Sequence, residues 1–197
     1  NVDYIIDSSG VRDNVIKSRK LIDGKIIKKV FVTYSPQEVD FTMVLGCNED
    51  KLNIEEHDII STSICDATAI APVLNAINKK FNIDSGHITT LHPWLSYQNL
   101  MDGPSSSWSI PGKIYGHYEL GRSVIGNLIP KPTSAIDVTF KSIENLDRNK
   151  IGSFSYRIPT SIVCSADLTL KINNKIVLED LLSIFNEWER RQKFKIF

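Results

Sequence analysis

The sequence predicts an α/β segment followed by an α+β segment, with helices on one face of the second sheet. Up to residue 64, short and nearly continuous apolar runs alternate with connecting segments, as the strands of a parallel sheet buried on both faces do. From residue 86 the strand patterns are rich in Thr, Val and Ile and alternate apolar with polar residues, which is typical of a half-exposed, largely antiparallel sheet. The change of pattern therefore indicates two different sheets.

The expected elements follow one another without an internal repeat. In the first part, strands are expected at residues 2–7, 28–34 and 41–47, with a helix at 11–22. The helix after Cys65 has one apolar face, because its apolar residues recur every three or four positions, at Ile70, Val73, Leu74, Ile77 and Phe81. In the second part, strands are expected at residues 86–92, 135–143, 152–160 and 162–172, and a last helix at 177–190. Cys47 and Cys164 lie within strand patterns and are expected in the core.

Composition narrows the classes of partner. The 23 basic and 23 acidic residues balance, so the total charge does not indicate a nucleic-acid partner or an anionic membrane surface. No apolar run approaches the roughly 20 residues that span a bilayer. The three cysteines are odd in number and widely separated, and no Cys or His cluster has metal-site spacing. We therefore expect a reducing, cytoplasmic location, no disulfide framework and no metal.

Cys65 and His92 are the most informative residues of the chain. Cys65 stands where a strand passes into the helix with the apolar face, and His92 follows 27 positions later at the end of the strand pattern 86–92. This interval holds one helix and one return strand, so the thiol and the imidazole can meet. A cysteine at a helix N-terminus beside a histidine is how proteins make a thiolate nucleophile at neutral pH. An inert buried thiol and a packed imidazole are the plainer alternative.

Further motifs surround this pair in a fixed order. They are the strand ending in Ser8-Ser9-Gly10, the segments 28–30 and 46–51, the strand 57–61 before Cys65, Thr89-Thr90-Leu91-His92, Ile129-Pro130 with Thr133-Ser134, and the strand 156–160 with its continuation 166–169. Because these motifs occur in this order, the chain resembles the glyceraldehyde-3-phosphate dehydrogenase family over nearly its whole length. Each motif alone is weak evidence for the resemblance, but six motifs in the correct order together are strong evidence against coincidence.

The resemblance implies a domain organisation and a cofactor. Residues 1–64 would be the C-terminal part of a Rossmann-type dinucleotide-binding domain, and residues 65–197 a catalytic domain that is incomplete at its C-terminus. The cofactor would be NAD or NADP, the partners would be a small-molecule aldehyde and further copies of the chain in a homotetramer, and the isolated fragment would be inactive. Ser8, Ser9, Gly10 and Thr33 would line the cofactor site.

The resemblance also implies the chemistry. Cys65 would attack an aldehyde, and the resulting hemithioacetal would lose hydride to the nicotinamide and leave a thioester. His92 would act as general base, and its cation would lower the pKa of the thiol. Arg157, Thr133 and Ser134 would bind a phosphate group.

The neighbours of Cys65 depart from the family pattern. Ile64 and Asp66 flank the cysteine where the family has hydroxyl residues. A carboxylate at Asp66 suits the helix start but raises the pKa of the adjacent thiol, because like charges disfavour the thiolate. Loss of the hydroxyls weakens transfer of the acyl group to inorganic phosphate, so water is an alternative acceptor. Ser134 also replaces a glycine of the family, which leaves less room for close backbone approach.

Three functions are compatible with the sequence. The first is an NAD(P)-dependent oxidoreductase that oxidises an aldehyde, such as glyceraldehyde 3-phosphate in glycolysis, through a thioester on Cys65. The second is a non-catalytic paralogue of the same fold that serves as a binding or assembly scaffold, which the lost hydroxyls favour. The third is a cysteine acyl-transfer enzyme without redox chemistry.

Overall fold

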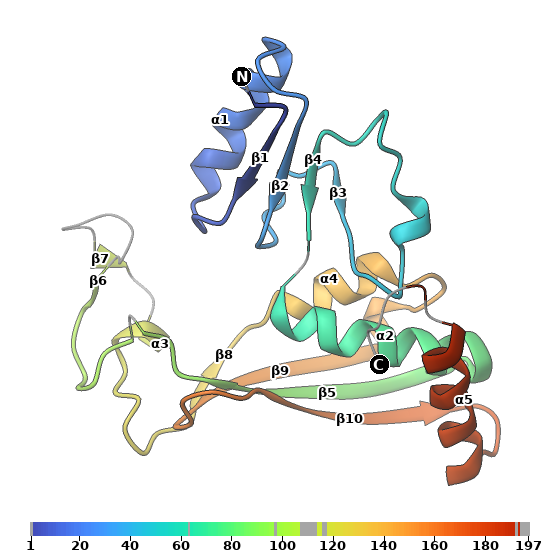
Figure 1. Ribbon diagram of the computed structural model, residues 1–197. Coiled ribbons are helices and arrows are strands. Elements are labelled where there is room, and N and C mark those ends of the chain that lie inside the picture. The colour runs from blue at the N-terminus through green and yellow to red at the C-terminus, as the bar shows by residue number, and fades with distance from the viewer. Residues whose placement is uncertain are drawn as a thin grey trace. The chain divides into compact units, whose positions relative to one another are not determined.

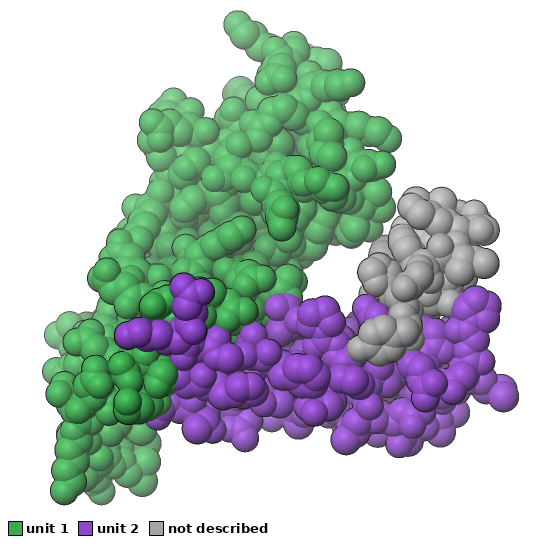
Figure 2. Space-filling model, turned by 180° about the vertical axis from the view of Figure 1, so that it is seen from behind, with its two compact units in different colours: residues 1–85, 134–148, 171–197 green, residues 86–133, 149–170 purple. Residues whose placement is uncertain are grey.

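The computed structural model describes residues 2–62, 64–96, 98–106, 114–115, 118–191 and 193. The chain divides into two compact units, coloured green and purple in Figure 2. Unit 1 comprises Asn1–Ser85, Ser134–Arg148 and Lys171–Phe197, and unit 2 comprises Gly86–Thr133 and Asn149–Leu170. The division into domains at residue 65 stays a prediction.

Unit 1 contains the expected parallel sheet. Its strands are β1 (Tyr4–Asp7), β2 (Lys29–Val32), β3 (Phe41–Thr42) and β4 (Ile59–Ser61), in the order β1-β2-β4-β3, and the neighbouring strands run parallel (Figure 1). Helix α1 (Arg12–Asp23) connects β1 to β2, and its Val15 is buried with Val30, Val32 and Ile59. The α/β prediction is therefore confirmed. Strand β3 is shorter than predicted, because the chain turns at residues 45–47 before the 3-10 helix η1 (Glu49–Lys51). Cys47 lies half-buried in this turn, outside any strand.

Three further helices also belong to unit 1. They are α2 (Cys65–Phe81), α4 (Ala135–Ser142) and α5 (Leu178–Arg191), and α2 contacts both of the others. The helix predicted after Cys65 and the last helix are thereby confirmed. No helix in the described part of the chain is long and apolar enough to cross a membrane.

The strand predicted at residues 135–143 is wrong, because this segment forms α4. Its β-branched residues favoured a strand, but the buried positions have helical spacing: Ala135, Ile136, Val138, Thr139 and Ser142. The Thr139 hydroxyl donates to the carbonyl of Ala135 at 2.8 Å, and the Ser142 hydroxyl to that of Thr139 at 2.8 Å. Packing against α2 and these internal hydrogen bonds outweigh the local preference for a strand.

Most of a second, four-stranded sheet lies in unit 2. Its strands are β5 (Ile83–Pro93), β8 (Ile129–Lys131), β9 (Ile151–Ile158) and β10 (Ser165–Ile172), in the order β10-β5-β9-β8. β9 runs parallel to β5 and antiparallel to β8, so the sheet is mixed and the α+β prediction is confirmed. Smaller elements are β6 (Ser105–Ser106) with β7 (Ile114–Tyr115), α3 (Tyr118–Gly121) and η2 (Arg148–Lys150). Cys164 precedes β10 and is exposed, so its predicted place in the core is wrong.

Asp40 fixes the start of the strand that leads to Cys65. Its Oδ2 accepts hydrogen bonds from the backbone N–H groups of Asp58 at 2.9 Å and Ile59 at 2.8 Å, and its Oδ1 accepts one from Arg19 at 2.5 Å. Burial alone would raise the pKa of this carboxyl group, but the hydrogen bonds from Arg19 and the two amides outweigh burial and lower it. The ionised form of Asp40 therefore stabilises the fold.

We expect Asp40→Ala to lower the free energy of unfolding by about 1–3 kcal/mol, because two strand amides lose their acceptor. Urea unfolding at pH 7 measures the loss. The folded pKa is lowered, so the contribution is present above the unfolded pKa of about 3.9 and disappears as the pH falls through the folded value. The exposed Asp50, replaced in the same way, serves as control and should cost less than about 0.5 kcal/mol. Equal losses in the two variants would contradict the role of Asp40.

Candidate active site

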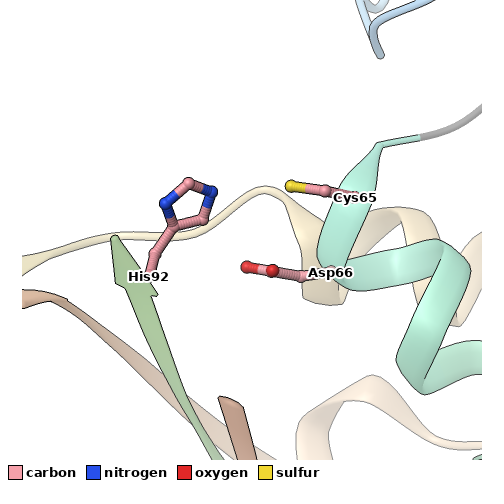
Figure 3. Close-up of side chains that lie close together, drawn as sticks. All are labelled: Cys65, Asp66 and His92. Carbon is pink, nitrogen blue, oxygen red and sulfur yellow. The ribbon is translucent and has the colours of Figure 1, made fainter. Parts of the chain in front are cut away.

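Cys65 is the first residue of α2, as the sequence predicted (Figure 3). Strand β4, whose three residues are buried, leads into an extended Ile64 that serves as N-cap without a side-chain hydrogen bond. Asp66 lies beside Cys65 in the first helical turn and is buried. A carboxylate at this position complements the positive end of the helix dipole, which helps the helix to begin here.

The surroundings of Cys65 disfavour its thiolate. Although the residue as a whole is exposed, burial of its thiol group raises the pKa most, and the charge of Asp66 raises it further. Backbone hydrogen bonds at the helix start act in the opposite direction but do not outweigh these two effects. The effect of Asp66 predicted from the sequence is therefore confirmed. At neutral pH these effects favour the thiol over a preformed thiolate.

His92 and Arg157 lie opposite each other in unit 2. They are paired in the parallel register of β5 with β9. Nη1 of the buried Arg157 contacts Nδ1 of His92 and donates a hydrogen bond of 2.9 Å to the carbonyl oxygen of Pro93. Beneath them, the Thr90 hydroxyl donates to Ser155 Oγ at 2.8 Å and joins the same two strands. The sequence did not predict the contact between His92 and Arg157, because their strands lie far apart along the chain.

Cys65 belongs to unit 1 and His92 to unit 2, so the pairing of the thiol with the imidazole stays a prediction. Thr133 ends the segment that follows β8, in unit 2, and Ser134 precedes α4 in unit 1. Ser134 has φ −80° and ψ −11°, an ordinary conformation that requires no glycine. The roles of Thr133, Ser134 and Arg157 toward a phosphate group likewise stay predictions.

The four residues predicted to line a cofactor site lie at one edge of the parallel sheet. Ser8, Ser9 and Gly10 follow β1, and Thr33 follows β2. Ser9 Oγ accepts hydrogen bonds from the amide of Val11 at 3.1 Å and from the Asn14 side chain at 3.0 Å. Gly10 has φ +69°, a conformation that favours glycine. The carboxyl edge of parallel strands is where nucleotides bind in open α/β sheets.

Tyr34 is a residue of this edge that the sequence reasoning missed. Its hydroxyl lies 3.0 Å from Oδ2 of Asp7 and 2.9 Å from the carbonyl of Val11, and donates its one proton to either. Burial and the hydrogen bond to Asp7 raise the pKa of Tyr34 to about 12, so the hydroxyl stays protonated. Tyr34, Gly10, Arg12 and Glu38 are among the residues that line a cavity of about 450 Å³. The position of Tyr34 directly after Thr33, at the end of a strand, was the sequence signal that could have identified it.

Comparison with known proteins identifies relatives of the chain. Residues 64–197 match the family described as "Glyceraldehyde 3-phosphate dehydrogenase, C-terminal domain". The chain is 34% identical over 186 residues to the glyceraldehyde-3-phosphate dehydrogenase of Wickerhamomyces ciferrii, covering 94% of this chain and 52% of the relative. It is 31% identical over 185 residues to the cytosolic enzyme of Chlamydomonas reinhardtii, covering 94% of this chain and 51% of the relative. The chain thus spans about half the length of the curated relatives that it matches. It belongs to the glyceraldehyde-3-phosphate dehydrogenase family.

Proposed function

We propose that the protein containing this chain oxidises an aldehyde through a thioester on Cys65, with hydride transfer to NAD or NADP. The observation that carries the proposal is the succession of a helix opened by Cys65 and a strand that bears His92 near its end, in a chain of this family. The proposed substrate is a phosphorylated sugar aldehyde such as glyceraldehyde 3-phosphate, since the named relatives are glyceraldehyde-3-phosphate dehydrogenases.

The thiol needs a base at the moment of attack, because the pKa of Cys65 is raised. We propose that His92 takes the thiol proton while Sγ bonds to the carbonyl carbon of the aldehyde, which gives a hemithioacetal. Transfer of hydride from that carbon to a bound nicotinamide, together with loss of the hydroxyl proton to solvent, would leave an acyl thioester on Cys65. Asp66 occupies the helix start, where hydroxyl groups would be needed to hold an attacking phosphate. Water is therefore a candidate for the group that attacks the thioester and releases the carboxylic acid.

The cofactor and the substrate anion have separate candidate positions. The hydroxyls of Ser8, Ser9 and Thr33 and the left-handed Gly10 suit a dinucleotide at the carboxyl edge of the parallel sheet. NAD or NADP bound there would supply the hydride acceptor. Arg157, with Thr133 and Ser134, would bind the anionic group of the substrate, because a guanidinium presents a planar fork of donors to phosphate. We further propose a cytoplasmic homo-oligomer, as the family resemblance implies.

One observation favours a second candidate function. The raised pKa of Cys65 is opposite to the lowered value that activates most nucleophilic cysteines. A paralogue that keeps the fold as a binding scaffold has no need of a reactive thiol. The two candidate functions differ in whether the thiol of Cys65 takes part in a reaction.

If the first proposal holds, the complete protein will reduce NAD or NADP when given one of a panel of phosphorylated aldehydes. Cys65→Ser should abolish the reaction, because no thioester can form, while Cys164→Ser, which alters another exposed cysteine, should leave it intact. Absorbance of the reduced nicotinamide follows the reaction. A folded protein that reduces neither cofactor with any aldehyde of the panel would support the scaffold instead.

Asp66→Asn should lower the pKa of Cys65, because it removes the nearby negative charge. We expect alkylation of Cys65 by iodoacetamide at pH 7 to become about three- to tenfold faster, since one pKa unit changes the thiolate fraction about tenfold. Peptide mass spectrometry reports the rate for Cys65 alone. The control is Asp137→Asn, which removes an acid from the first turn of α4. Unchanged reactivity in Asp66→Asn would show that Asp66 does not restrain the thiol.

A further inference from the structure

Three atoms meet where β5 ends beside β9. Arg157 Nη1 contacts His92 Nδ1 and lies 2.9 Å from the carbonyl oxygen of Pro93. His92 Nδ1 lies 2.9 Å from the same oxygen. All three residues belong to unit 2, and the strand register pairs His92 with Arg157 and Pro93 with Ile158. Nδ1 therefore has one neighbour that can only donate a hydrogen bond and one that can only accept.

These two neighbours require different protonation of the same nitrogen. A guanidinium has donors and no acceptor, so Nδ1 must offer its lone pair to Arg157. A carbonyl oxygen only accepts, so a hydrogen bond from Nδ1 to Pro93 needs a proton on Nδ1. A neutral imidazole carries one N–H, which is on Nε2 in the first case and on Nδ1 in the second. Contact with Arg157 favours the Nε2–H form, in which Pro93 accepts from Arg157 instead.

We infer that Arg157 is a positioning residue that sets the tautomer of His92 and thereby controls whether this histidine can act as a base. The inference rests on the proposed function, in which His92 takes a proton from Cys65. While Arg157 donates to Nδ1, Nε2 carries a proton and can accept none, and Nδ1 is occupied. When Arg157 leaves, Pro93 stabilises a proton on Nδ1, and Nε2 presents its lone pair. Solvent carries the proton between the nitrogens.

An anion is the ligand that draws Arg157 away. The guanidinium pairs with phosphate or carboxylate through two parallel hydrogen bonds, each stronger than a bond to a neutral imidazole. Arrival of an anionic aldehyde would therefore bind the substrate and prepare the base in one event. A neutral aldehyde of the same size would leave His92 in its Nε2–H form, so the anionic group would raise kcat as well as lower KM.

Nitrogen NMR of the complete protein, labelled with ¹⁵N-histidine, tests this inference without cofactor or aldehyde. His92→Gln identifies the His92 signals, and inorganic phosphate is the titrant at constant pH. We expect the Nε2–H tautomer without phosphate and conversion to the Nδ1–H tautomer at saturating phosphate. An Nδ1–H tautomer without phosphate, or an Nε2–H tautomer that persists at saturation, overturns the inference. Because the NMR measurement requires no turnover, failure of the dehydrogenase proposal can be distinguished from failure of this inference.

Variants of Arg157 add a second readout. Arg157→Met should show the Nδ1–H tautomer without phosphate, and Arg157→Lys, which still only donates, should restore the Nε2–H form in the absence of phosphate. The control is Arg148→Met, which removes an exposed arginine that pairs with Asp137 at 3.2 Å and should leave the His92 signals unchanged. If the Nε2–H form persists in a folded Arg157→Met variant, Arg157 has a merely structural role. Should that variant not fold, the phosphate titration of the unaltered protein decides the matter alone.

Discussion

The parallel pairing of β5 with β9 places His92 beside Arg157, and the proposed chemistry depends on that register. The buried hydrogen bond between Thr90 and Ser155 joins the strands two residues before this pair, and Ile88 is fully buried on β5. A slip of one residue would turn Arg157 to the other face of the sheet, because successive side chains of a strand alternate. The packing of the strands therefore decides which groups can contact the imidazole.

Different neighbouring groups limit the reactivity of the thiol and of the imidazole. At the start of α2, burial and the charge of Asp66 keep the thiol protonated despite the favourable helix terminus. On β5, Arg157 contacts Nδ1 of His92, and in the inferred resting state this contact places the imidazole proton on Nε2. Neither restraint needs strained backbone, and an anion at Arg157 would relieve the second. In the proposed function, these two effects would keep the nucleophile inactive at rest until an anionic substrate binds.

Much of the fold followed from sequence periodicity, and the exceptions have physical causes. Strands and helices with a clear period appeared where expected, and the place of Cys65 at the start of α2 was predicted from the apolar face that follows it. Residues 135–143 were misassigned because β-branched residues suit a strand locally, whereas contact with α2 selects a helix. Cys164 was placed in the core from its strand pattern, but the chain leaves the sheet there and exposes it.

The candidate site was predictable only where its residues are close in sequence. Asp66 adjoins Cys65, so its effect on the thiol pKa could be foreseen. The contact of Arg157 with His92 joins residues 65 positions apart and depends on a sheet pairing that no local pattern encodes. Tyr34 was missed for a related reason, since its hydrogen bonds reach Asp7 and Val11 across the edge of the parallel sheet.

In the proposed function, an anion at Arg157 activates Cys65 as a nucleophile. This activation is tested most directly by the rate at which Cys65 reacts with a neutral alkylating reagent, measured with and without inorganic phosphate. The complete protein carrying Cys164→Ser suits the measurement, because Cys47 is half-buried and burial above all raises its pKa to about 12, which makes it unreactive at pH 7. The predicted result is a Cys65 that reacts more slowly than glutathione in plain buffer and several-fold faster once phosphate saturates the protein. A Cys65 that outpaces glutathione without phosphate, or that gains nothing from phosphate, would contradict the account.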